Sequence, residues 1–302
     1  MNLNINFANV KFKNPIVTAS GTFGFGREYA QYYDISKLGG ICVKGLTAAP
    51  RLGNKPPRVA ETPMGMLNSV GLQNPGVDEF IKDELPYLRG FDLVVIANIS
   101  GNTIDEYAQM TQKLSDAGID MIEVNVSCPN VKAGGMAFGT SAESVAAVTE
   151  AVMKVTKAPV MIKLSPNVTD IAAIAKAAQE AGADAISLIN TLLAMRIDTK
   201  TKKPVLHNNV GGLSGPAILP VAVRMVWQVA NTVKIPILGM GGVATGNDAV
   251  EMMLAGASLV GVGTACFDDP YAPLKIIEGL AGYAKEHEIE KIGDITGKVV
   301  IN

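Results

Sequence analysis

The sequence predicts a single (β/α)8 barrel, and three observations support this fold class. The chain has 302 residues, a length at which α/β barrels are commonly one domain. Short apolar runs alternate with longer amphipathic runs, as expected for strands that each lead into a helix. The same helix-to-strand turn recurs at Ala117-Gly118-Ile119-Asp120, Ala181-Gly182-Ala183-Asp184 and Ala255-Gly256-Ala257-Ser258. We therefore predict one domain over residues 1–302, with long loops over the C-terminal mouth of the barrel.

Eight apolar runs have the length and composition of buried parallel strands. They are Ile16–Ala19, Ile41–Lys44, Leu93–Asn98, Met121–Val126, Val160–Leu164, Ala185–Ile189, Pro236–Gly239 and Leu259–Val262. Helices are predicted between them at Thr103–Ala117, Ser141–Thr156, Thr169–Ala181, Pro216–Thr232 and Thr245–Ala255. The hydroxyls of Thr103, Ser141 and Thr169 are expected N-caps, and Gly118 and Gly182 stand where a helix end favours a left-handed residue.

Composition excludes several classes of protein. The formal net charge is −2, which favours neither nucleic acid nor an anionic membrane surface as a partner. No signal peptide or long apolar run is visible, and Cys42, Cys128 and Cys266 are too widely spaced for a disulfide framework. His207 and His287 are too few for a metal site, so none is predicted. A cytoplasmic protein without a membrane span is expected.

Polar residues and glycines follow the predicted strands, where a barrel keeps its chemistry. Desolvated lysine and asparagine side chains are costly without partners, so a ligand rich in carbonyl, amide and phosphate groups is expected among them. These residues are Ser20, Lys44, Gly45, Asn98, Asn125, Cys128, Lys163, Asn190, Thr191, Gly241, Gly242, Gly263 and Thr264.

Cys128 lies in the segment Asn125-Val126-Ser127-Cys128-Pro129-Asn130, directly after a predicted strand. Pro129 prevents the strand from continuing, which places the thiol in the loop at the barrel mouth. A half-buried structural cysteine is the alternative interpretation. The flanking amides and the position past a strand end favour a reactive thiol.

Two glycine-rich turns, Gly239–Gly242 and Gly261–Thr264, follow the last two predicted strands. Barrels commonly bind a phosphate at this place. The first turn also matches a dinucleotide fingerprint, but that interpretation requires an acidic residue about 20 positions further on. The chain has Gly261, Val262 and Gly263 there, so the dinucleotide interpretation is rejected.

Two long connections are expected over the mouth. Residues 64–72 contain Asn68 and Ser69 beside glycines and are interpreted as folding over a ligand, with a surface excursion as the alternative. Residues 192–215 are basic in their middle and are interpreted as a solvated, mobile lid. Trp227 is expected in the core, and Cys42 is expected to be buried and inert.

Together these motifs resemble the dihydroorotate dehydrogenase family along essentially the whole chain. The most specific are Thr18-Ala19-Ser20-Gly21, Val43-Lys44-Gly45, Asn68–Leu72, Asn125–Asn130, Lys163–Pro166 and Ile189-Asn190-Thr191. The resemblance implies an FMN-containing barrel that oxidises dihydroorotate to orotate in pyrimidine biosynthesis. Cys128 would remove the C5 proton as the catalytic base, and FMN would accept the C6 hydride.

The resemblance also implies the other site residues. The substrate would be held by Lys44, Asn68, Ser69, Val70, Gly71, Leu72, Asn125, Asn190 and Thr191. FMN would be held by Ser20, Lys44, Gly45, Asn98, Asn125, Lys163, Ile189 and Gly215, with Gly241, Gly242, Gly263 and Thr264 at its phosphate.

The continuation Lys132–Gly139 resembles the NAD-linked class of this family, class 1B. That class works with an electron-transfer subunit carrying FAD and a [2Fe-2S] cluster, around a homodimer of the catalytic chain. The fumarate-dependent soluble class, class 1A, is the alternative within the family. Two further alternatives are an aldolase with a Schiff base at Lys163 and a non-catalytic barrel that binds a phosphorylated ligand.

Overall fold

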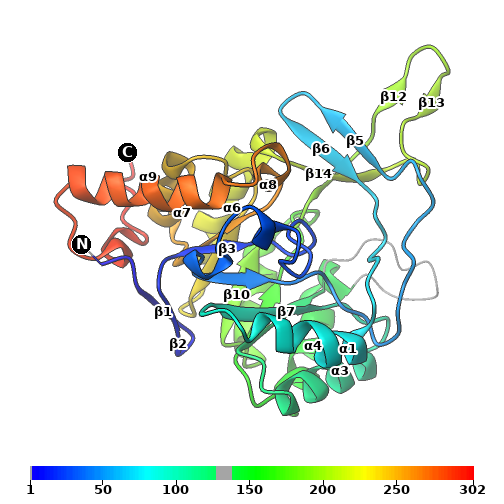
Figure 1. The fold of residues 1–302 in the computed structure, drawn as a ribbon, viewed down its shortest axis with the longest axis horizontal. Helices are drawn as coiled ribbons and strands as arrows, with labels where there is room; N and C mark the ends of the chain where they lie inside the picture. Colours follow the sequence, from blue (N-terminus) through cyan, green and yellow to red (C-terminus); the bar gives the residue numbers. More distant parts are fainter. Residues whose placement is uncertain (1, 127–137) are drawn as a thin grey trace.

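Eight parallel strands close into a barrel in the computed structural model, which describes residues 2–126 and 138–302 (Figure 1). Around the barrel the strand order is β10-β15-β16-β3-β4-β7-β8-β9. The strands are β3 (Ile16–Thr18), β4 (Gly40–Cys42), β7 (Val94–Ile99), β8 (Met121–Asn125), β9 (Val160–Lys163), β10 (Ala185–Leu188), β15 (Ile237–Met240) and β16 (Leu259–Val262). The predicted fold class and all eight predicted strands are confirmed.

The barrel strands are buried along their whole length, which explains why they read as continuous apolar runs. Every residue of β7 and β8 is buried, because one face packs inside the barrel and the other against helices. Parallel register joins them directly, with Ile96 opposite Met121 and Ile99 opposite Val124.

Helices follow most of the barrel strands and cover the outside of the barrel (Figure 1). The longer ones are α3 (Ile104–Asp116), α4 (Ala142–Met153), α5 (Ile171–Glu180), α6 (Leu219–Ala230), α7 (Gly246–Ala255) and α9 (Ala272–Glu286). Short helical turns are α1 (Val77–Glu79), α2 (Leu85–Leu88) and α8 (Ala265–Asp268), with a π-helical turn at Phe80–Glu84 and 3-10 turns at Tyr29–Gln31, Ile35–Lys37, Phe138–Thr140, Pro216–Ile218 and Ile292–Ile295.

Two of the three predicted N-caps are confirmed. The Thr103 hydroxyl accepts from the Glu106 N–H at the start of α3, and Ser141 caps α4. Thr169 was the wrong cap for α5, because the neighbouring Asp170 carboxylate accepts from two N–H groups of the first turn over 3.0 and 3.1 Å. Gly118 and Gly182 have the predicted left-handed conformation, with φ of +74° and +98°.

A short hairpin near the N-terminus packs at the opposite end of the barrel from the mouth. It consists of β1 (Ile5–Phe7) and β2 (Val10–Phe12), paired antiparallel. The Phe7 and Phe12 rings meet edge to face at 6.1 Å, and both are buried. A Cβ added at Gly40, the first residue of β4, would lie 3.1 Å from the Phe12 ring, so the hairpin covers the start of the barrel strands.

Both long connections fold into one four-stranded antiparallel sheet, which we call the outer sheet (Figure 1). Its order is β11 (Leu192–Ala194), β14 (Gly211–Ser214), β6 (Gly65–Asn68) and β5 (Val59–Thr62). A separate hairpin of β12 (Ile197–Asp198) and β13 (Lys203–Pro204) extends from it. The predicted solvation of the basic residues is confirmed, since Arg196, Lys200, Lys202 and Lys203 are exposed. The strand pairing of this segment was not predicted.

Trp227 was expected in the core, and this expectation was wrong. The buried face of α6 is formed by Ala222, Met225, Val226 and Val229, whereas the Trp227 side chain lies on the outer side and is 39% exposed. Within residues 2–126 and 138–302, no helix is both long enough and apolar enough to cross a membrane.

Candidate active site

A cavity of about 640 Å³ lies at the C-terminal ends of the barrel strands, beneath the outer sheet. Its volume falls in the range that holds small ligands and cofactors. All predicted substrate- and cofactor-binding residues line it: Ser20, Lys44, Gly45, Asn68, Ser69, Val70, Gly71, Leu72, Asn98, Asn125, Lys163, Ile189, Asn190, Thr191, Gly215, Gly241, Gly242, Gly263 and Thr264. Cys128 lies outside the described residues. The structure therefore brings together segments from the whole length of the chain.

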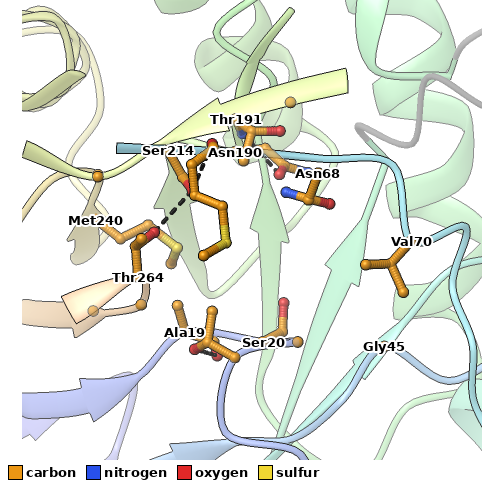
Figure 2. A pocket seen from close by; sticks show the side chains of 18 of the residues that line it. Ala19, Ser20, Gly45, Asn68, Val70, Asn190, Thr191, Ser214, Met240 and Thr264 are labelled. Carbon is orange, nitrogen blue, oxygen red and sulfur yellow. Dashed lines mark hydrogen bonds between the residues drawn. The ribbon is translucent and has the colours of Figure 1, made fainter. Parts of the chain in front are cut away.

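Figure 2 shows how the outer sheet and the barrel face each other across this cavity. Asn68 and Val70 come from the outer sheet and the loop after it, while Ala19 and Ser20 follow the first barrel strand. The Thr264 hydroxyl donates to the Ser214 hydroxyl over 2.8 Å, which ties the turn after β16 to β14. The outer sheet is thus fixed to the barrel at the cavity rim.

The turn after β15 can only be made by glycine. Gly241 and Gly242 have φ of +129° and +82°, a region that residues with a side chain rarely adopt. A Cβ at Gly242 would lie 2.7 Å from the Leu219 nitrogen and 2.9 Å from the Gly215 oxygen. Backbone is therefore exposed to the cavity here without side-chain cover, which suits a phosphate held by N–H groups.

An amide network lies past the ends of β8 and β10. The Asn190 side-chain nitrogen donates to the Asn125 side-chain oxygen over 3.4 Å, and the Thr191 N–H donates to the Asn190 side-chain oxygen over 2.8 Å. The Tyr107 hydroxyl of α3 donates to the Asn125 carbonyl over 2.8 Å. These contacts hold the asparagines at the cavity wall in fixed orientations.

A cation also stands in the cavity wall. The Lys163 ammonium, on β9, donates to the Ser20 hydroxyl over 3.2 Å and to the Glu123 carboxylate over 3.4 Å. Sequence reasoning missed Glu123. The available signal was a single glutamate inside the otherwise apolar run Met121–Val124 of β8, where an unpaired carboxylate is costly.

Two buried polar atoms of cavity residues have no hydrogen-bond partner among the residues that the structure describes. They are the side-chain oxygen of Asn98 and the hydroxyl oxygen of Ser69. Buried polar groups are nearly always satisfied in folded proteins. A ligand with N–H or O–H groups is the partner that such atoms require.

Other cavity residues were also missed, among them Arg51, Asn54, Ser214 and Met240. Asn54 donates to the Ser69 carbonyl over 2.8 Å, and its amide leaves no room for a Cβ at Gly71. Arg51 and Asn54 lie on a loop and Ser214 lies on the outer sheet, where no periodic pattern indicates which side chains face inward, whereas Met240 is the last residue of β15.

The two described cysteines are not exposed nucleophiles. Cys42 is buried at the end of β4, as predicted, and burial together with the nearby Glu123 carboxylate raises its pKa well above the usual range. Burial likewise raises the pKa of Cys266 to about 12. Across residues 2–126 and 138–302, no group of three His, Cys, Asp or Glu side chains is placed to hold a metal ion.

This fold and site define a (β/α)8-barrel enzyme whose ligand cavity lies at the C-terminal mouth and combines cations, amides and a glycine turn. The family model described as Dihydroorotate dehydrogenase matches residues 2–283. The chain belongs to the dihydroorotate dehydrogenase family.

Curated relatives match over essentially their full length. A protein of Alkaliphilus oremlandii is 57% identical over 298 residues, covering 99% of each chain. A protein of Thermoanaerobacter pseudethanolicus is 54% identical over 302 residues, covering 100% of each chain. Each is named "Dihydroorotate dehydrogenase B (NAD(+)), catalytic subunit".

Proposed function

We propose that this chain oxidises dihydroorotate to orotate in pyrimidine biosynthesis, as the catalytic subunit of an NAD-linked dihydroorotate dehydrogenase. One observation carries the proposal: the residues that the family resemblance implies for substrate and cofactor, Cys128 apart, line a single cavity at the barrel mouth. Full-length relatives with that name support the same reaction and the NAD-linked class rather than the fumarate-dependent class.

The cavity fits the FMN that this function requires. The Gly241-Gly242 turn and Gly263-Thr264 would hold the phosphate, because three glycines expose backbone to the cavity there and the Thr264 hydroxyl lies beside them. Asn98 and Lys163 would contact the polar part of the ring system, Asn98 through an oxygen that has no partner within the described part of the chain and Lys163 as a cation. When bound, FMN supplies a two-electron acceptor for the C6 hydride.

The substrate is an anion with ring carbonyls and N–H groups. Lys44 would neutralise its carboxylate, and Asn68, Asn125, Asn190 and Thr191 would match its carbonyl and N–H groups. Cys128 would remove the C5 proton, which requires the thiol to reach its thiolate form near the ring. The side chains of this chain therefore orient the substrate and accept a proton.

The aldolase alternative requires Lys163 to act as a neutral amine. The Lys163 nitrogen is instead ion-paired with the fully buried Glu123 carboxylate over 3.4 Å, a contact that opposes nucleophilic attack. The non-catalytic alternative leaves the amide network and the two lysines without a reacting ligand. Both alternatives are weaker than the oxidoreductase.

A partner subunit is part of the proposal. The chain has three cysteines, and Cys42 and Cys266 are buried and distant in sequence, so it does not ligate its own iron–sulfur cluster. We propose an electron-transfer subunit that carries FAD and a [2Fe-2S] cluster, assembled around a homodimer of this chain. Electrons from the barrel would reach NAD through that subunit.

The test is anaerobic reduction of the purified chain by dihydroorotate, followed at the visible flavin absorbance. We expect a yellow protein that bleaches on addition of dihydroorotate and releases FMN, one per chain, when heated. A colourless protein contradicts the proposed cofactor. A yellow protein that dihydroorotate does not bleach contradicts the proposed substrate.

A further inference from the structure

Glu123 occupies the interior of the barrel, directly beneath the cavity. It is fully buried, and its two oxygens accept hydrogen bonds from four other barrel strands. One oxygen accepts from the Ser187 hydroxyl of β10 over 2.7 Å. The other accepts from the Asn98 amide of β7 over 2.5 Å, the Cys42 thiol of β4 over 3.2 Å and the Lys163 ammonium of β9 over 3.4 Å.

The environment keeps this carboxylate ionised. Burial alone would raise the pKa of Glu123, but the Lys163 charge and the hydrogen bonds from Ser187, Asn98 and Cys42 outweigh burial and lower it. A buried ion pair is a poor means of stabilising a fold, since apolar residues of similar volume often serve as well or better. The pair with Lys163 therefore calls for a role beyond stability.

Two of the four partners of Glu123 line the cavity, namely Lys163 and Asn98. A carboxylate can only accept hydrogen bonds, so Asn98 must turn its nitrogen toward Glu123 and its oxygen away. That oxygen is buried and has no hydrogen-bond partner among the described residues, and it lies 2.8 Å from the position of a Cβ at Gly45, which also lines the cavity. Glu123 thus decides which end of the Asn98 amide a ligand meets.

We propose that Glu123 is a positioning residue for the cofactor, acting through Lys163 and Asn98, which it holds as a cation and an acceptor side by side. The inference rests on the proposed function, because it assigns these two groups to the pyrimidine part of FMN. That part of the ring carries an N–H between two carbonyls, which matches an acceptor beside a cation. Glu123 also offsets part of the Lys163 charge, and so lowers the reduction potential of bound FMN relative to Lys163 alone.

The first experiment measures the reduction potential of bound FMN in the wild-type protein and in Glu123→Gln, which removes the charge at constant size. The unopposed Lys163 charge then favours the reduced cofactor. We expect the ratio of reduced to oxidised FMN at a fixed potential to rise about tenfold, equivalent to about 30 mV for a two-electron couple. An unchanged potential in a folded variant that holds FMN overturns the proposal.

A double-mutant cycle tests whether the effect passes through Lys163. In a Lys163→Met background the buried carboxylate has no cation and is expected to take up a proton. Adding Glu123→Gln there should change the FMN ratio by less than about twofold, since no charge is then removed. A shift of equal size in both backgrounds overturns the proposed route.

Two further variants control the measurement. Glu278→Gln removes an exposed carboxylate on α9 and should leave the potential unchanged. Circular dichroism and thermal melting of each variant report folding. If Glu123→Gln does not fold, Glu123→Asp takes its place, because it keeps the carboxylate but moves it away from Lys163 by the length of one methylene group. A smaller rise in potential supports the proposal, and no rise overturns it.

The outcome is separable from that of the proposed function. If the wild-type protein holds FMN but dihydroorotate does not reduce it, the substrate is wrong and the potentials still decide the role of Glu123. If dihydroorotate reduces the wild-type protein and the potentials do not differ, only the role of Glu123 is wrong.

Discussion

Asn190 and Asn125 contact each other through their side chains, with the Asn190 nitrogen 3.4 Å from the Asn125 oxygen. The contact joins the ends of β8 and β10 across β9, at the wall of the cavity. It also settles the amide orientation of Asn125, whose oxygen faces Asn190 and whose N–H groups are directed elsewhere. Because both residues are proposed to bind the substrate, the effect of this contact on substrate binding can be tested directly.

Asn190→Asp keeps the shape of the side chain but removes the donor and adds a negative charge near an anionic substrate. We expect kcat/KM for dihydroorotate to fall by about 10- to 100-fold, while FMN remains bound. Steady-state kinetics with the flavin content of each preparation measures both. In Asn190→Ala the value of kcat/KM should also fall. Wild-type kinetics in both variants would contradict a role of Asn190 in substrate binding.

Cys128→Ala is expected to keep FMN and to slow its reduction by dihydroorotate by roughly two to four orders of magnitude, because the base is lost. Cys128→Ser should lose less, and its residual rate should rise with pH, because a hydroxyl is a weaker acid than a thiol. Stopped-flow absorbance in single turnover measures the step. Cys266→Ala is the matched control, since that thiol is buried in α8 and its removal should leave the rate unchanged.

Gly242→Ala and Gly282→Ala should act in opposite directions. The first places a Cβ 2.7 Å from the Leu219 nitrogen at φ +82°, so we expect loss of FMN and a lower melting temperature. The second lies on α9 with no heavy atom within 4 Å of the added Cβ and should stabilise the protein by about 0.5–1 kcal/mol. Fluorescence of released FMN and thermal melts distinguish the two. Full FMN occupancy in Gly242→Ala would contradict the proposed phosphate site.

Stability should depend on pH through Glu123. Its pKa in the folded protein lies below the ordinary value of 4.5, so below about pH 4.5 the unfolded chain binds a proton that the folded chain does not. The carboxylate therefore stabilises the fold above that pH, and the contribution is lost as the pH falls toward the folded pKa. Urea unfolding measured between pH 6 and 3.5 should show that the free energy of unfolding falls less steeply with decreasing pH in Glu123→Gln than in the wild type. Equal slopes would refute this linkage, and Glu278→Gln provides the comparison.

The isolated chain and its complex with the electron-transfer subunit should differ in how fast they reduce NAD. The isolated chain should reduce NAD slowly, because one face of the bound cofactor is occupied by the substrate and the dinucleotide fingerprint lacks its acidic residue. Adding the electron-transfer subunit should restore rapid NAD reduction. Efficient NAD reduction by the chain alone would contradict the relay, and rapid turnover with fumarate would favour the class 1A alternative.

The barrel could be predicted because its strands are buried on both faces, so each reads as a continuous apolar run with a polar residue after it. Glu123 could not, since its meaning depends on Cys42, Asn98, Lys163 and Ser187, which come from four other strands. The spacing of these residues in the sequence does not indicate that their side chains meet inside the barrel.

The outer sheet escaped prediction for a different reason. Its strands are three or four residues long, and β6 and β14 contain glycines, so they lack a readable alternation. Trp227 was misplaced because a large aromatic residue in a helix suggests burial, while the helix periodicity, followed strictly, places position 227 away from Val226 and Val229. Arg51 and Asn54 were also not predicted as cavity residues, since they lie on a loop, and loops have no periodic pattern of apolar residues.

The ladder between β6 and β14 joins two segments that are about 145 residues apart, with Asn68 opposite Gly212 and Met66 opposite Ser214. Each excursion also pairs within itself, β5 with β6 and β11 with β14, and the β6–β14 ladder supplies the hydrogen bonds that join the two. Length changes near this ladder should therefore have to occur in pairs, whereas the tip between Asp198 and Lys203 is exposed and joined only to itself. That tip is the place where a fluorophore or an affinity tag can be inserted without disturbing the cavity.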